Sequence, residues 1–163
     1  MHNYKQLSPH FNEHEFRCRD VDRGLRGAPY CNGSVGKGID LRLIQGLEEL
    51  RARIGKPVNV SSGYRCLPYN KHLGGAAKSQ HLYGTAADVW VQGMTTEQIM
   101  RIVEELDIGT GRGLYPGQGI VHIDVRHGLH GKDGNVVRWV KQRGKPYLTV
   151  KAFEGWLQAG RWS

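Results

Sequence analysis

The chain has 163 residues, 39% of them hydrophobic, a length and composition that suit one compact domain. Its 23 Lys and Arg residues exceed its 15 Asp and Glu residues, and the formal charge of +8 predicts attraction to polyanions such as nucleic acid, anionic lipid or bacterial cell-wall polymers. No apolar run approaches the roughly 20 residues needed to span a bilayer, and residues 1–6 lack the apolar region of a conventional signal peptide.

The N-terminal part of the chain is polar and rich in glycine. We expect residues 1–38 to form an irregular segment that is anchored by Phe11 and Phe16 onto a core formed by residues 39–163. With no internal repeat and no linker, residues 1–163 are predicted to form a single domain.

The cysteines are odd in number and far apart in the sequence. Cys18, Cys31 and Cys66 include no Cys-x-x-Cys pair, which argues against both a disulfide framework and a structural zinc knuckle. Free buried thiols are therefore expected, with a Cys18–Cys31 bridge as the alternative.

The first regular elements follow the N-terminal segment. Apolar residues at helical spacing predict a helix from Asp40 to about Ile54, and Gly55 with the following Lys-Pro pair ends it. Residues 58–60 alternate as a short strand, and residues 61–64 leave that strand in a loop.

A strand and a well-marked helix come next. Residues 86–91 are predicted to form a strand with Asp88 on the face opposite to its apolar neighbours. Residues 94–106 are predicted to form a helix, because Thr95 and Gln98 match a capping box at its start.

The C-terminal third contains two further predicted strands. Residues 109–119 form a glycine-rich stretch that we interpret as a turn, and the strand Ile120–Val125 follows it. Residues 136–140 are a candidate partner strand, and residues 149–157 a short closing helix. The order of elements predicts an α+β domain, with helices packed on a small, mainly antiparallel sheet.

Two short segments carry the ligand set of a catalytic metal site. His81 and Asp88 lie in residues 79–88, where Gly84 permits a tight turn and small neighbours leave room. His122 and Asp124 are two apart on a predicted strand and so share one face. Two imidazoles and the Asp88 carboxylate are a typical catalytic zinc set, with one position open for water. The pattern predicts a metal-dependent hydrolase.

Competing interpretations of the histidines are weaker. An iron-binding facial triad would use His122 and Asp124 with a distant downstream histidine, but His127 and His130 lie in the adjacent loop. The remaining histidines of the chain are expected to be surface or structural residues: His2, His10, His14, His72, His127 and His130.

The motifs together resemble a known family. The chain is similar to the zinc D-Ala-D-Ala carboxypeptidases and related peptidoglycan endopeptidases, which share their fold with sonic hedgehog and the lysostaphin-type peptidases. The resemblance runs from residues 7–11 to Trp139. Its motifs are Glu15–Cys18, Ser62–Cys66, Asn70, Gly74-Gly75, Ser79–His81, Gly84, Ala87, Asp88, Val121–Asp124 and Arg138.

The resemblance implies roles for several residues. It implies that His81, Asp88 and His122 bind Zn²⁺ and that Arg65 faces the active-site cleft. A guanidinium there suits a substrate carboxylate or the oxyanion that forms at the scissile carbonyl. The implied substrate is an amide bond in a peptidoglycan stem peptide or cross-link.

The general base is the point where the chain departs from the family. Several members carry a glutamate three residues before the last histidine ligand, but here that position is Gly119. Asp124 is the best remaining candidate for the base, and the alternative is that it orients a metal ligand. Tyr115 and His127 are further candidates for proton donation.

Three hypotheses for the function follow. The first is a zinc peptidase, of carboxypeptidase or endopeptidase type, that acts on the bacterial cell wall and serves as a phage or prophage endolysin. We expect a monomer that is made in the cytoplasm and reaches the wall after lysis or by another export route. The second is a catalytically silent zinc module that binds wall peptides. The third is a nucleic-acid binder, which the scattered basic residues do not favour.

Overall fold

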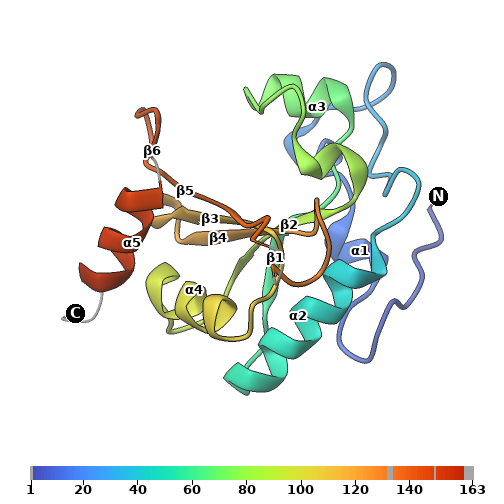
Figure 1. The fold of residues 1–163 in the computed structure, drawn as a ribbon. Coiled ribbons are helices and arrows are strands. Elements are labelled where there is room, and N and C mark those ends of the chain that lie inside the picture. Colours follow the sequence, from blue (N-terminus) through green and yellow to red (C-terminus); the bar gives the residue numbers. More distant parts are fainter. Residues whose placement is uncertain (1, 132–133, 149, 160–163) are drawn as a thin grey trace.

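A six-stranded sheet forms the centre of the molecule (Figure 1), in the order β1-β2-β4-β3-β5-β6. The computed structural model describes residues 2–131, 134–148 and 150–159. The strands are β1 Asn59–Ser62, β2 Ala86–Trp90, β3 Gly111–Tyr115, β4 Ile120–Asp124, β5 Val137–Lys141 and β6 Tyr147–Leu148. All neighbours are antiparallel except β3 and β5, which are parallel. The predicted α+β class with a mainly antiparallel sheet is confirmed.

The three longest helices lie on one face of this sheet (Figure 1). The α-helices are α1 Glu13–Phe16, α2 Leu41–Ile54, α3 Leu67–His72, α4 Thr96–Glu105 and α5 Val150–Ala159. Short 3₁₀ helices are η1 Val21–Arg23, η2 Gln80–Tyr83 and η3 Pro116–Gln118. In Figure 1, α4 lies beneath β3 and β4, with α2 and α5 on either side of it, whereas α3 lies above the sheet. The opposite face carries the side chains of Asp88, His122 and Asp124.

The ends of the two long predicted helices are as the sequence indicates. The Asp40 side chain accepts a hydrogen bond from the backbone N–H of Arg42 at the start of α2. Gly55 ends that helix in the left-handed region, at φ 72°. Both bonds of the Thr95/Gln98 capping box are present in α4. No described helix has the length and apolar character required to cross a bilayer.

The alternating strands place their apolar side chains in the core. Val121 and Ile123 of β4 are fully buried beside Val89 of β2. Phe11 and Phe16 are also buried, which confirms them as anchors of the N-terminal segment. Thr149, the predicted start of the last helix, lies outside the described residues, and α5 is seen from Val150.

The interpretation of residues 109–119 as a turn was wrong. Residues 111–115 form the central strand β3, and η3 follows. Two of its glycines are needed because neighbouring side chains occupy the space. A Cβ at Gly111 would lie 2.1 Å from Asp124 Oδ2, and one at Gly113 would lie 2.5 Å from the Trp139 indole. These glycines mark close approach to a strand, not chain reversal.

Candidate metal centre

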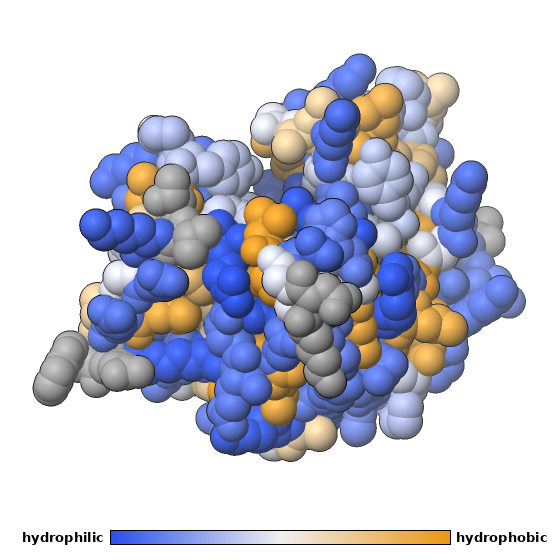
Figure 2. Space-filling view, viewed as in Figure 1, coloured by the Kyte–Doolittle hydropathy of each residue, from blue (hydrophilic) through white to orange (hydrophobic). Residues whose placement is uncertain are grey.

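A cleft of ≈ 490 Å³ opens on the face of the sheet opposite to α2, α4 and α5 (Figure 1). Figure 2 shows the notch at the top of the molecule, between the part that contains α3 and the β5–β6 hairpin. The residues that line it include His81, Asp88, His122 and Trp139. The sequence motifs therefore converge on one concavity.

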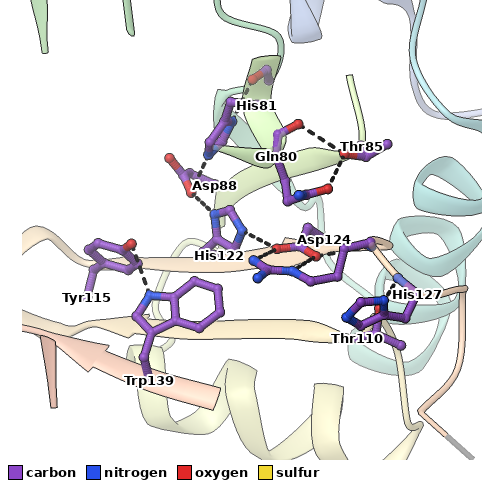
Figure 3. Close-up of polar contacts among 12 residues, drawn as sticks. Gln80, His81, Thr85, Asp88, Thr110, Tyr115, His122, Asp124, His127 and Trp139 are labelled. Atoms are coloured by element: carbon purple, nitrogen blue, oxygen red, sulfur yellow. Dashed lines mark hydrogen bonds and ion pairs between the residues drawn. The ribbon is translucent and has the colours of Figure 1, made fainter. Parts of the chain in front are cut away.

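Three buried donor atoms meet in this cleft (Figure 3). His81 Nε2 lies 3.3 Å from Asp88 Oδ1, and His122 Nδ1 lies 3.0 Å from the same oxygen. The side chains are 3%, 7% and 6% exposed for His81, Asp88 and His122, respectively. The three candidate ligands, predicted from segments more than 30 residues apart, lie close enough to share one ion.

Strand pairing explains how two of the ligands come together. Asp88 on β2 is directly paired with His122 on β4, so both side chains leave the sheet on the same face. His81 comes from η2, and its Nδ1 lies 2.6 Å from the carbonyl oxygen of Gly63. That contact directs Nε2 toward Asp88. The next turn requires Gly84, at φ 69°, because a Cβ would lie 2.2 Å from the Gly38 carbonyl oxygen.

The buried charges of the cluster stabilise one another. Burial opposes ionisation of Asp88, but the neighbouring imidazoles outweigh it and hold the pKa of this carboxyl well below its usual range. Burial lowers the pKa of His81. Burial acts in the same direction on His122, but its hydrogen bonds to the Asp124 and Asp88 carboxylates outweigh burial and raise its pKa to about 8. The cluster thus offers an ionised carboxylate between two imidazoles.

The donor set suits zinc. Two imidazole nitrogens and one carboxylate oxygen are the three protein ligands of many catalytic zinc sites. In each ring, the second nitrogen contacts an oxygen, Gly63 O for His81 and Asp124 Oδ2 for His122. Such outer contacts fix the tautomer and orientation of a ligating histidine. The chemistry of the residues present therefore fits the metal.

Arg65 lies beside the cluster, where it was expected to face the cleft. Its terminal nitrogen donates to Asp88 Oδ2 at 2.8 Å, and its Nε donates to Ser62 Oγ at 2.9 Å. The side chain is 16% exposed and lines the cleft. Arg65 therefore holds the Asp88 carboxylate by the oxygen that the two imidazoles do not contact, and it still reaches the cavity.

Asp124 lies behind His122. Its Oδ2 is 2.8 Å from His122 Nε2, and its two oxygens accept hydrogen bonds from Nε and a terminal nitrogen of Arg126. The carboxylate is fully buried, and these contacts hold its pKa well below the usual value despite burial. The position favours the second of the two predicted roles, that of orienting a ligand. It also separates Asp124 from the metal-facing side of His122, which disfavours the iron triad.

Two residues of the site were not identified from the sequence as site residues, Trp139 and Arg126. The Trp139 ring lies 5.1 Å from the His122 ring, and the Arg126 guanidinium lies 5.4 Å from the indole centre. Gly113 is paired with both His122 and Trp139 across the sheet, and its lack of a side chain leaves room for the indole. A glycine directly opposite a predicted ligand, on the strand next to it, is the signal that could have indicated this contact.

The two other candidates for proton transfer lie in different places. Tyr115 lines the cleft, and its hydroxyl oxygen accepts a hydrogen bond from Trp139 Nε1 at 3.1 Å. His127 is exposed and is absent from the described lining of the cleft. The structure thus places Tyr115, and not His127, near the site.

Comparisons with known proteins agree with this geometry. The sequence model of a family described as Peptidase M15 matches residues 9–124, a range that includes Arg65, all three candidate ligands and Asp124. The chain is also 43% identical over 44 residues to a protein of Streptomyces albus G named zinc D-Ala-D-Ala carboxypeptidase. That match covers 26% of this chain and 17% of the relative.

Proposed function

Because the chain belongs to the peptidase M15 family, we propose that it hydrolyses an amide bond in peptidoglycan stem peptides or cross-links, using Zn²⁺ held by His81, Asp88 and His122. The observation that carries the proposal is the convergence of three buried donors on an open cleft. The relative from Streptomyces albus G supports the choice of metal and of substrate by its name.

The metal and the side chains that line the cleft have different roles in the proposed hydrolysis. When bound, zinc supplies a Lewis acid that activates water and polarises the scissile carbonyl. Arg65 carries five N–H donors, of which some contact Ser62 and Asp88. The others can donate to the oxyanion or to a substrate carboxylate. Burial raises the pKa of Tyr115, so its hydroxyl keeps its proton at neutral pH and can donate a hydrogen bond to the substrate or the leaving amine.

The charge of the cleft supports an anionic substrate. Four cationic side chains line it, Arg65, Lys78, Arg126 and Lys141, whereas Asp88 is the one carboxylate in its described lining. Stem peptides carry carboxylates, and a cleft of one sign concentrates ligands of the other. We extend the proposal to action on the cell wall as an endolysin, a role that the net charge of +8 supports because the wall is rich in anionic groups.

A silent wall-binding module is the second candidate. It is favoured by Gly119, which stands where several family members carry a glutamate base. The engagement of both Asp124 oxygens with Arg126 points the same way. In this case the metal would recognise a carboxylate of the peptide without cleaving it.

Digestion of purified muropeptides separates the two candidates. Zinc-loaded protein is incubated with monomeric and cross-linked muropeptides, and the products are identified by mass spectrometry. We expect loss of a terminal residue or opening of a cross-link that disappears in His122→Ala. The matched control is His10→Ala, since His10 is an exposed histidine paired with Glu48, away from the cleft.

Each outcome has one meaning. Zinc-dependent cleavage that His10→Ala retains supports the peptidase, and the product identifies it as a carboxypeptidase or an endopeptidase. Saturable muropeptide binding without any product supports the silent module. If the zinc-loaded, folded protein shows no cleavage and no binding, both proposals are overturned.

A further inference from the structure

Three thiol groups from distant parts of the sequence meet near the N-terminal segment. Cys18 lies between α1 and η1, Cys31 lies in the loop after η1, and Cys66 is the residue before α3. Their sulfur atoms and a carboxylate oxygen of Asp20 all lie within 4.8 Å of one another. Cys18 and Cys66 are buried and Cys31 is partly exposed. This cluster has no part in the proposed hydrolysis.

The spacing of the sulfur atoms suits a shared ion. Cys18 Sγ and Cys66 Sγ are 3.8 Å apart, far longer than the roughly 2.05 Å of a disulfide bond. Two thiolates that bind one tetrahedral zinc at about 2.3 Å are themselves about 3.8 Å apart. The two sulfurs therefore already have the separation that a common metal requires.

Asp20 holds the loop that brings the third thiol to the other two. One of its oxygens accepts hydrogen bonds from the backbone N–H groups of Cys31 and Asn32, and the other accepts from Val21 and Gly33. The Cys18 N–H donates to Ser34 O at 2.9 Å, which closes the same loop. The backbone from 18 to 34 is thus folded around the cluster.

The apolar cluster around the thiols is small. Its buried residues are Cys18, Cys66 and Tyr69, and partly buried Leu25, Tyr30 and Tyr64 pack against them, Tyr64 also contacting the main core. Small loop-rich regions that lack a core of their own are commonly stabilised by metal sites or disulfides. The observed sulfur distance agrees with the metal and not with the disulfide.

We propose that Cys18, Cys31 and Cys66 bind a structural zinc ion. On binding, each thiol releases its proton to solvent and coordinates as a thiolate, so no oxidant or reductant is involved. A carboxylate oxygen of Asp20 completes the tetrahedral set, and it exchanges one of its backbone N–H contacts for the metal.

Such an ion stabilises one wall of the hydrolytic site. Cys66 directly follows Arg65, which contacts Asp88. The two residues before Arg65 also make contacts with distant parts of the chain. The Tyr64 N–H donates to Phe16 O at 2.7 Å, and the Gly63 carbonyl oxygen contacts His81 Nδ1. The thiolate site therefore fastens the segment 63–66 to the N-terminal segment.

Zinc stoichiometry with selective loss of each site tests the proposal. Protein loaded with zinc and freed of excess is measured by inductively coupled plasma mass spectrometry. We expect about two equivalents per chain, one for each donor group, and about one in either Cys31→Ser or the double variant His81→Ala, His122→Ala. Ser34→Ala is the matched control, because it alters the same loop without removing a thiol and should keep both equivalents.

A second measurement leaves Cys18, Cys31 and Cys66 unchanged. Cobalt-substituted protein that carries His81→Ala and His122→Ala should show a thiolate-to-cobalt charge-transfer band, which zinc addition removes. The proposal is overturned if the parent protein binds only one zinc equivalent and Cys31→Ser still binds that one equivalent. It is also overturned by an intact mass lower by a pair of thiol hydrogens, which indicates a disulfide. Neither result depends on whether muropeptides are cleaved.

Discussion

The imidazole of His122 is held between two carboxylates, with Nδ1 3.0 Å from Asp88 Oδ1 and Nε2 2.8 Å from Asp124 Oδ2. Because Arg126 also bonds both Asp124 oxygens, Asp124 is fixed on the side of the ring away from the cleft. A buried carboxylate in this position orients a ligating histidine and increases its basicity.

Replacing Asp124 should therefore affect metal binding first. We expect Asp124→Asn to weaken zinc affinity by roughly 10–100-fold, since the amide is a poorer partner for the imidazole. Competition with a chromogenic chelator measures this change. Asp22→Asn is the control, because Asp22 is an exposed carboxylate paired with Arg17 and Arg19. Unchanged zinc affinity with lost hydrolysis would instead support Asp124 as the general base.

Arg65 should contribute to turnover through its fork of donors. We expect Arg65→Lys to lower kcat/KM by roughly 100-fold, because lysine keeps the charge but cannot contact Asp88 and the oxyanion together. Steady-state hydrolysis of a muropeptide, with zinc content measured in parallel, provides the test. Arg53→Lys, which changes an arginine paired with Glu105, should have no effect. Loss of activity that merely follows loss of zinc would contradict a direct role of Arg65.

A methyl group at Gly113 should damage both fold and site. Its Cβ would lie 2.5 Å from the Trp139 indole, so we expect Gly113→Ala to reduce the free energy of unfolding by about 1–3 kcal/mol. Urea unfolding followed by tryptophan fluorescence measures the loss. Gly117→Ala is the matched control, because a Cβ there meets nothing within 4 Å. Equal stability of the two variants would show that the indole can move away without cost.

Acid sensitivity should arise in part from a buried arginine beneath the sheet. Arg112 is 1% exposed and donates to Asp107 Oδ1 at 2.6 Å and to Glu104 Oε2 at 2.7 Å. Burial raises the pKa of Asp107, but the Arg112 guanidinium outweighs it and lowers the pKa below its ordinary value. Because the pKa of Asp107 is lower in the folded protein than in the unfolded chain, its ionised form stabilises the fold. This stabilisation is fully present above the unfolded pKa of about 3.9 and is lost as the pH falls through the pKa of the folded state.

Asp107→Asn should therefore be less stable than the parent at pH 7 and should lose less further stability on acidification. Urea midpoints at a series of pH values between neutral and about 3 measure this difference. Glu49→Gln, on the surface of α2, serves as the control for removal of a negative charge. A parallel pH dependence in Asp107→Asn and the parent protein would exclude this ion pair as a cause of acid sensitivity.

The sequence was most informative where local rules decide the structure. The helices over residues 41–54 and 96–105 follow from apolar spacing and from caps that depend on a few adjacent side chains. The face shared by His122 and Asp124 follows from strand alternation alone. These features depend on contacts within a short stretch of chain.

Features that depend on distant residues were not predictable from the pattern. The glycines of residues 111–115 predict a turn, but they belong to a strand, because the reason for them lies in the distant side chains of Asp124 and Trp139. The cysteine spacing gave no indication of a site, since the loop and the helix that bring Cys31 and Cys66 to Cys18 are set by tertiary contacts. The partner of Asp124, Arg126, likewise becomes evident only from its geometry.

The three proposed ligands differ in how firmly the fold confines them. Asp88 and His122 belong to adjacent hydrogen-bonded strands and cannot separate unless that ladder opens. His81 belongs to a single turn outside the sheet. We therefore expect an ion to dissociate by swinging of that turn, so the residence time of the metal reflects a local hinge and not global unfolding.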